Sequence, residues 1–244
     1  ILNGADLRQW NPEIDKKIPE TYSARSMAGK AKCKEELQKK MGLEVNPDIP
    51  VIGIVTRLVD QKGIAEIFAP TYGSIYQICT DMKVQFAILG SGESWCENEI
   101  CALQSKLPNL RAYIGYDDAL SHLIEAGSDF FLMPSKYEPC GLNQIYSMLY
   151  GTLPIVRKTG GLADTVDNYN QQIGEGTGFV FEQLTPRAIY DTVGWAVWAY
   201  YNKKDHIKKM QQAGMKKTFG WDEAAEKYVQ VYKEALERGC GIRK

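Results

Sequence analysis

Pro134-Ser135-Lys136-Tyr137-Glu138-Pro139-Cys140-Gly141-Leu142-Asn143-Gln144 connects an apolar run at residues 129–133 with a helical pattern that begins at Leu142. The apolar run has the length and composition of a buried strand. Because the first N–H groups of a helix lack partners within the helix, a strand, a glycine-bearing loop and a helix start together favour a phosphate site. A carboxylate beside a phosphate is electrostatically costly, so Glu138 is better suited to a neutral polyol such as a sugar. An ordinary turn with a surface glutamate explains this loop equally well on its own.

Strand-like and helix-like segments alternate along the rest of the chain. The apolar runs that we interpret as strands are residues 51–56, 84–89, 111–115, 129–133, 153–156 and 178–181. We expect helices at residues 24–41, from 63 to about 79, from 93 to about 106, at 120–126, from 142, and at 186–201, 203–216 and 221–237. Short strands that are apolar on both faces and separated by helices predict a parallel sheet covered on both sides. The expected fold is therefore α/β, a doubly wound parallel sheet with C-terminal helices.

The composition of the chain argues against several kinds of binding partner. The 244 residues are 44% hydrophobic and 24% charged, and the formal net charge of −1 gives no general attraction for nucleic acid or an anionic membrane. The longest apolar stretches, such as 130–134 and 193–198, fall well short of the roughly 18 residues that span a bilayer. Six cysteines without a C-x-x-C pair and only two histidines argue against a zinc site and favour a reducing compartment. We therefore expect no metal, nucleic-acid or membrane partner.

Polar and glycine residues cluster directly after the predicted strands. Arg57 and Lys62 follow the first strand, and the corresponding segments after the next four strands are residues 90–92, 115–117, 138–143 and 157–161. Because ligands bind at the carboxyl ends of the strands in an open parallel sheet, we expect these loops to form one site. An arginine fork and a lysine point charge suit a diphosphate, although solvated loop cations would look the same in sequence. Tyr116 is placed either to stack on a nucleobase or to lie in the core.

Several common nucleotide and catalytic motifs are missing or incomplete. Gly90-Ser91-Gly92 resembles part of a dinucleotide-binding fingerprint, but Trp95 stands where the third glycine belongs, and the motif follows the second strand. We therefore reject an NAD site. The chain also has no G-x-x-x-x-G-K-[ST] loop, no D-x-D pair that suggests a metal held through carboxylates, and no arguable Ser-His-Asp arrangement.

Together these segments resemble the C-terminal half of the bacterial glycogen synthases and plant starch synthases, which are retaining glucosyltransferases of the GT-B architecture. The resemblance spans nearly the whole chain, and Phe219-Gly220-Trp221 is similar to the family's Phe-Ser-Trp before its last helix. Seven further segments match in order and at family-like spacing, namely residues 1–12, 56–63, 90–93, 114–116, 121–122, 134–144 and 157–164. One such segment would be weak evidence, whereas seven in order are specific. The resemblance implies a Rossmann-like domain that binds a nucleotide sugar.

The resemblance also implies roles for individual residues. Arg57 and Lys62 would bind the diphosphate of the donor, and together with Glu138 they would form the catalytic set. Tyr116 would pack against the adenine, and Glu138 would hydrogen-bond the glucose hydroxyl groups. Asn143 and the amides at Gly141 and Leu142 would hold the distal phosphate. The donor site would be completed by Gly90, Gly92, Cys140, Thr159, Gly160 and Gly161.

The glucosyl transfer that the resemblance implies needs few catalytic groups from the protein. Two cations and a helix terminus stabilise the charge that develops on a departing nucleoside diphosphate without a metal ion. Retention commonly uses two carboxylates, but the second glutamate that related GT-B enzymes carry eight positions after the first is replaced here by Tyr146. We therefore expect transfer from the same face of the sugar, with the departing phosphate as the base. ADP-glucose is the expected donor, and no cofactor is expected.

The resemblance divides the chain into three parts. Residues 1–23 would be an interdomain segment, 24–218 the donor-binding domain, and 219–244 a C-terminal helix that packs toward an N-terminal domain outside this sequence. That domain would bind the acceptor, an α-1,4-glucan, at its non-reducing end, so the isolated chain would be inactive. The aromatic helix at 186–201 is either an ordinary core helix or a docking surface for that domain.

Two alternatives stay open at this point. The first is a nucleotide-binding or regulatory module without catalysis, and the second is another GT-B sugar transferase that uses UDP-glucose. The cytoplasm of a bacterium is the expected compartment, or a plastid if the chain comes from a plant.

Overall fold

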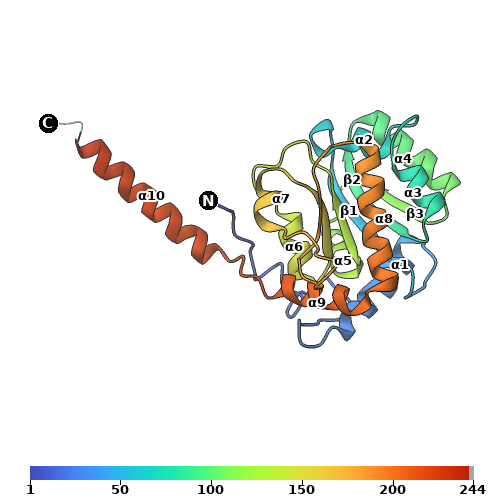
Figure 1. The fold of residues 1–244 in the computed structure, drawn as a ribbon, viewed down its shortest axis with the longest axis horizontal. Coiled ribbons are helices and arrows are strands. Elements are labelled where there is room, and N and C mark those ends of the chain that lie inside the picture. The colour runs from blue at the N-terminus through green and yellow to red at the C-terminus, as the bar shows by residue number, and fades with distance from the viewer. Residues whose placement is uncertain (242–244) are drawn as a thin grey trace.

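One six-stranded parallel sheet forms the centre of the protein (Figure 1). The computed structural model describes residues 1–241, with side chains through Arg238. The strands are β1 Val51–Leu58, β2 Gln85–Gly92, β3 Leu110–Ile114, β4 Phe130–Met133, β5 Leu153–Arg157 and β6 Phe179–Phe181. Their order is β3-β2-β1-β4-β5-β6, and every neighbouring pair is parallel, which confirms the predicted doubly wound sheet. The chain order reverses between β1 and β4, and this is the point where open α/β sheets bind ligands.

Helices cover both faces of the sheet. The helices of the described residues are α1 Ala28–Met41, α2 Ile64–Phe68, α3 Ile75–Asp81, α4 Ser94–Lys106, α5 Asp118–Gly127, α6 Asn143–Leu149, α7 Gly160–Thr165, α8 Pro186–Asn202, α9 Lys204–Met215 and α10 Trp221–Gly241, with a 3₁₀ turn, η1, at Asp60–Lys62. Buried side chains of α2, α3, α4, α8 and α9 share one cluster with the sheet, whereas α1, α5, α6 and α7 pack on the other face.

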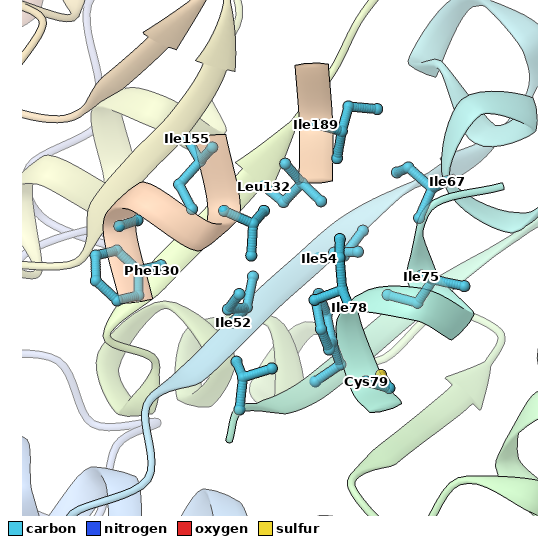
Figure 2. Packing of buried hydrophobic residues seen from close by; sticks show 14 of the residues in the cluster. Ile52, Ile54, Ile67, Ile75, Ile78, Cys79, Phe130, Leu132, Ile155 and Ile189 are labelled. Atoms are coloured by element: carbon cyan, nitrogen blue, oxygen red, sulfur yellow. The ribbon is translucent and has the colours of Figure 1, made fainter. Parts of the chain in front are cut away.

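The larger core cluster explains why the strands are apolar on both faces. Ile52 and Ile54 of β1 lie beside Phe130 of β4 on the face covered by α3 and α8, and Ile189 closes the cluster (Figure 2). Val51 of β1 and Phe131 of β4, the alternate residues, pack in the cluster that includes α1 and α5. Because successive strand side chains point to opposite faces, a strand between two helical layers must be apolar throughout.

Three elements differ from the sequence prediction. The helix expected from residue 63 to about 79 is wrong, because α2 ends before Pro70 and α3 begins only at Ile75. Proline lacks the N–H of a helix interior and pushes the residue before it toward extended backbone, as seen at Ala69 (φ −57°, ψ 132°). The second strand continues to Gly92 instead of stopping at Leu89, and the short helix α7 was not predicted.

The aromatic side chains of α8 are explained mainly by packing within this chain. The Trp195 ring lies edge-on to Phe179 with centroids 5.1 Å apart, and it also contacts Tyr169. Tyr200 packs edge-on against Phe130, with centroids 6.1 Å apart. Trp198 keeps 39% of its surface exposed. The helix is therefore largely a core helix, the first of the two interpretations drawn from its sequence.

The last helix, α10, differs from the other helices in its position and in the exposure of its side chains. Figure 1 shows α10 projecting away from the sheet and its helices. Ala224 near its start is buried, but Val229, Val231, Tyr232 and Leu236 are about half exposed or more. Among residues 1–241, no helix combines the length and the apolar character that crossing a membrane requires.

Candidate functional site

A cavity of about 480 Å³ opens at the carboxyl ends of β1 and β4. This is the switch point of the sheet, where the sequence predicted convergent loops. The cavity is lined by Asn3, Ile54, Val55, Thr56, Arg57, Lys62, Ile67, Leu132, Met133, Pro134, Ser135, Glu138, Pro139, Cys140, Gly141, Leu142 and Asn143. The predicted loops after the first and fourth strands therefore meet in one place.

Two charged groups of this cavity, those of Lys62 and Glu138, are paired with each other. The Lys62 Nζ atom lies 2.5 Å from Oε2 of Glu138, and both side chains are largely buried. Ser135 donates a second hydrogen bond to the same oxygen, at 3.2 Å. The ammonium group offsets the negative charge that would otherwise oppose a phosphate nearby. Glu138 and a phosphate can thus share one cavity.

Several contacts fix the two loops against each other. Gln61 donates from Nε2 to the Tyr137 carbonyl at 3.2 Å, and the Lys136 N–H donates to the Gln61 carbonyl at 2.8 Å. Arg157 donates from Nη1 to the Lys136 carbonyl at 2.5 Å, so this predicted loop cation supports the backbone. Arg57 is exposed, and its guanidinium group donates from Nη2 to Oε1 of Gln61 over a long distance of 3.4 Å. Its fork therefore stays available at the rim of the cavity.

The loop that carries Glu138 lies directly on the glycine pair of α7. A Cβ atom at Gly160 would lie 2.1 Å from the Glu138 carbonyl oxygen, and one at Gly161 would lie 2.0 Å from the Cys140 carbonyl oxygen. The Gly161 N–H donates to the Glu138 carbonyl at 3.0 Å. Only glycine permits this approach. Residues 159–161 do not line this cavity, and Gly160 and Gly161 support the loop through its backbone.

Gln144, for which the sequence suggested no role, fixes the same loop through its side chain. Its side chain is fully buried, and Nε2 donates to the carbonyls of Cys140 and Gly141 at 2.9 and 3.1 Å. Gly141 has φ +73°, a conformation that favours glycine. The loop is thus fixed by buried hydrogen bonds and by glycine geometry together.

A second cavity, of about 320 Å³, adjoins the first. The two share Val55, Thr56, Arg57 and Asn143, and the second extends past Gly90, Ser91 and Gly115 to Tyr116. Tyr116 is 84% exposed, so the alternative that placed it in the core is wrong. Asn143 donates from Nδ2 to the Val55 carbonyl at 2.6 Å, which ties the start of α6 to β1. Gly92 lies within β2, where a Cβ would meet the Leu58 carbonyl oxygen at 2.2 Å, and it lines neither cavity.

A buried carboxyl group that the sequence did not predict lines the second cavity. Glu125 of α5 is 2% exposed, and its Oε2 atom accepts a hydrogen bond from Ser147 at 2.7 Å. Burial raises the pKa of this carboxyl group to about 8. A glutamate in the middle of a predicted helix gives no sequence signal that it faces a cavity.

The N-terminal segment contributes to both cavities as well. The Trp10 ring is stacked between His122 and Tyr146, with centroid distances of 3.7 and 3.9 Å. His122 is buried and lies 2.7 Å from the Asp15 carboxylate, whose pKa is lowered by its hydrogen bonds to His122 and Tyr150 although burial opposes this shift. The Asn3 N–H contacts Cys140 Sγ at 3.3 Å. Residues 1–23 are therefore packed onto the site.

The structure thus brings most of the predicted site residues together. Those that line the larger cavity are Arg57, Lys62, Glu138, Cys140, Gly141, Leu142 and Asn143, and those that line the smaller one include Gly90, Tyr116 and again Arg57 and Asn143. Within residues 1–241, no cluster of three or more His, Cys, Asp or Glu side chains has an arrangement that could hold a metal ion. Cys79 is buried as expected, and Cys240 lies outside the residues whose side chains are described.

Comparison with known proteins adds independent findings. The family model described as "Glycosyl transferases group 1" matches residues 35–214. The chain is 63% identical over 242 residues to the glycogen synthase of Treponema denticola, covering 99% of the chain and 49% of that protein. It is 42% identical over 243 residues to soluble starch synthase 1 of Oryza sativa, covering 97% of the chain and 37% of that protein. The chain therefore spans half or less of the length of these relatives.

One solved structure is also similar to this chain in fold and sequence. The catalytic domain of starch synthase IV from Arabidopsis thaliana, bound to ADP and acarbose, matches with a TM-score of 0.89 and 32% identity. The match covers 97% of this chain and 49% of that one.

Proposed function

Because this chain belongs to the group 1 glycosyl transferases, we propose that it is the part of a glycogen or starch synthase that binds the nucleotide-sugar donor. The complete protein transfers glucose from ADP-glucose to the non-reducing end of an α-1,4-glucan, with retention of configuration. The acceptor binds through an N-terminal domain outside this sequence, and the chain alone does not transfer glucose. The likeness to bacterial glycogen synthases supports the bacterial cytoplasm as the compartment.

The observation that carries this proposal is the joined pair of cavities at the switch point of the sheet. The larger holds a carboxylate and an ammonium group, and the smaller ends at an exposed tyrosine, Tyr116. A nucleotide sugar has the matching parts in the matching order: a sugar, a diphosphate and a nucleoside. The ring of Tyr116 offers a face for the base.

In this assignment the diphosphate lies between Arg57 and Lys62, at the wall that the two cavities share. The guanidinium fork and the ammonium group stabilise the negative charge that develops on the departing diphosphate. Glu138 accepts hydrogen bonds from glucose hydroxyl groups and orients the sugar. The backbone amides at Gly141 and Leu142 face the distal phosphate, and the departing phosphate accepts the proton of the acceptor hydroxyl on the same face. No cofactor or metal ion takes part in the proposed reaction.

The choice of ADP-glucose over UDP-glucose rests on similarity. The starch synthase IV structure contains ADP, and that protein is 32% identical to this chain. Closing of the N-terminal domain over the donor would place the acceptor and exclude water, as two-domain clefts generally require.

Isothermal titration calorimetry of the 244-residue chain tests the proposal. We expect ADP-glucose and ADP to bind, UDP-glucose to bind more weakly, and Arg57→Ala to weaken ADP binding by about tenfold or more, the range for a charge-assisted contact. Arg187→Ala is the matched control, because Arg187 is an exposed arginine on α8 that forms an ion pair with Asp191 and lines neither cavity.

Three results would go against the proposal. Absence of binding by ADP and ADP-glucose would contradict a formed donor site. Equal weakening by Arg57→Ala and Arg187→Ala would place the ligand elsewhere on the surface. Tighter binding of UDP-glucose than of ADP-glucose would favour the alternative of a UDP-glucose-dependent transferase.

A further inference from the structure

The lining of the smaller cavity contains a carboxyl group that the proposed reaction does not use. Glu125 is 2% exposed and lines the cavity from α5. Its Oε2 atom accepts a hydrogen bond from Ser147 Oγ at 2.7 Å. Within the part of the chain whose side chains are described, the other oxygen, Oε1, makes no hydrogen bond. One oxygen is thus fixed by α6, and the other is free to meet a ligand.

Burial determines the chemical form of this group. The pKa of Glu125 is raised to about 8 because the charged form is desolvated, and the nearby Lys30 of α1 and the Ser147 hydroxyl lower it only in part. At neutral pH the carboxyl group is therefore protonated and carries one O–H donor. A buried donor without an acceptor is costly. An acceptor supplied by a bound molecule would satisfy it.

The position of Glu125 along the cavities indicates which part of a nucleotide it meets. The larger cavity and the shared wall hold the charged residues Arg57 and Lys62, and Tyr116 stands at the far end of the smaller cavity. Ser121 and Glu125 lie on one side of α5, about 6 Å apart along the helix axis. Both line the smaller cavity, which reaches from the shared wall to Tyr116. In a nucleoside diphosphate, the group between the phosphates and the base is the ribose.

We propose that the Glu125 carboxyl group hydrogen-bonds a ribose hydroxyl group of the bound nucleoside diphosphate, and that it makes the site favour ribonucleotides over deoxyribonucleotides. This inference rests on the proposed function, because it takes the ligand to be the nucleotide part of the donor. Ser147 acts in this arrangement as a positioning residue, since it fixes the orientation of the carboxyl plane.

Calorimetry with ADP, 2′-deoxy-ADP and 3′-deoxy-ADP tests this contact on the full 244-residue chain. For the unmodified chain, we expect loss of one hydroxyl group to weaken binding by about three- to tenfold, the range of a single hydrogen bond. Glu125→Leu should weaken ADP binding by a similar factor. It should also remove the difference in affinity between ADP and the deoxy analogue that the unmodified chain binds more weakly. Glu125→Gln should keep the difference, because the amide retains a donor and an acceptor.

The control separates loss of the contact from loss of stability. Gln38 is a buried polar residue of α1 that lines neither cavity, so Gln38→Leu should leave the preference for ADP over its deoxy analogues unchanged. If the unmodified chain binds both deoxy analogues as tightly as ADP, the inference is overturned, whatever the variants do. If Glu125→Leu weakens ADP and both deoxy analogues by the same factor, it is overturned as well. If the unmodified chain does not bind ADP at all, the proposed function fails and this inference fails with it.

Discussion

Lys62 and Glu138 come from loops that are 76 residues apart in sequence, yet their side chains form an ion pair in the larger cavity. The sequence placed each of them after a strand of the same sheet, and the strand order confirmed that both strands end at one edge. The pairing itself depends on how the two loops approach each other, which no local pattern encodes. The same limit applies to Glu125, whose burial is set by the packing of α5 against α6.

The ion pair predicts how Glu138→Gln changes ligand binding. The variant frees Lys62, so ADP affinity should stay the same or rise by a few-fold, because charge-assisted contacts are the strong ones. ADP-glucose binding should weaken by about tenfold relative to ADP binding, since the glutamate would contact the glucose. Calorimetry with both ligands measures this. Glu182→Gln, which alters an exposed pair with Lys158, is the control. Equal weakening of ADP and ADP-glucose by Glu138→Gln would argue against its contact with the sugar.

The raised pKa of Glu125 predicts a pH-dependent stability. Its ordinary value is 4.5 and its value in the folded chain is about 8. Between these values the folded state retains a proton that the unfolded state has lost, so rising pH favours unfolding. Glu125→Gln removes this effect. The variant should match the unmodified chain near pH 4.5. As pH rises toward 8, the variant should become more stable than the unmodified chain, by up to about 1.4 kcal/mol per pH unit.

Urea unfolding at several pH values between 4.5 and 8 measures that difference. Lys30 faces the same region, and burial lowers its pKa from 10.5 to about 8, so its own contribution changes above this window. A stability difference between Glu125→Gln and the unmodified chain that does not vary with pH would show that Glu125 is ionised in the folded state.

At the scale of elements, apolar runs predicted the strands well, because a parallel strand buried on both faces is apolar along its whole length. The helix between β1 and β2 was predicted poorly, since helical spacing continued across Pro70 and outweighed the break. Gly90 and Gly92 were predicted as loop residues, but they lie in β2, where only glycine fits beside the backbone of β1. Close contacts between backbones, unlike hydrophobic periodicity, cannot be predicted from a single sequence.

The contact between α7 and the Glu138 loop gives a prediction at this scale. In Gly161→Ala the new methyl group would overlap the Cys140 carbonyl oxygen, which lies 2.0 Å from the Cβ position. We expect a loss of about 1–3 kcal/mol in the free energy of unfolding, together with weaker ADP binding, because the loop must shift.

Gly194→Ala in α8 is the matched control for this substitution. Its Cβ would meet only the flexible end of Met82, at 3.2 Å, and alanine favours the helix. Chemical denaturation and ADP titration of both variants provide the comparison. Unchanged ADP affinity in Gly161→Ala would mean that the position of the loop does not govern the site.

At the scale of the whole molecule, the N-terminal segment and α10 are anchored differently. The N-terminal segment is held by the Trp10 stack and by the hydrogen bond from the Ala5 N–H to the Phe219 carbonyl, 2.6 Å long. The side chains of α10 from residue 225 to 238 are almost all exposed. Its apolar residues are consistent with the expected packing toward an N-terminal domain, which stays a prediction.

This difference predicts the effect of a truncation. Removing residues 225–244 should change the free energy of unfolding of the body by less than about 1 kcal/mol, because few buried contacts are lost. It should leave ADP affinity unchanged, since α10 lines neither cavity. Thermal and urea unfolding of the truncated chain check this expectation. A loss of several kcal/mol would mean that α10 folds back onto the body in solution.

Hydrogen–deuterium exchange of the 244-residue chain, with and without ADP-glucose, tests most directly the claim that the carboxyl edge of the sheet binds the donor. Amide exchange reports local opening, so a ligand slows it where it binds. We predict slower exchange in residues 57–63, 115–121 and 136–143, with no change around Lys34 and Lys208 at a separate cavity. Protection confined to the cavity around Lys34 and Lys208, or no protection at a concentration of ADP-glucose that saturates the calorimetric signal, would contradict the account.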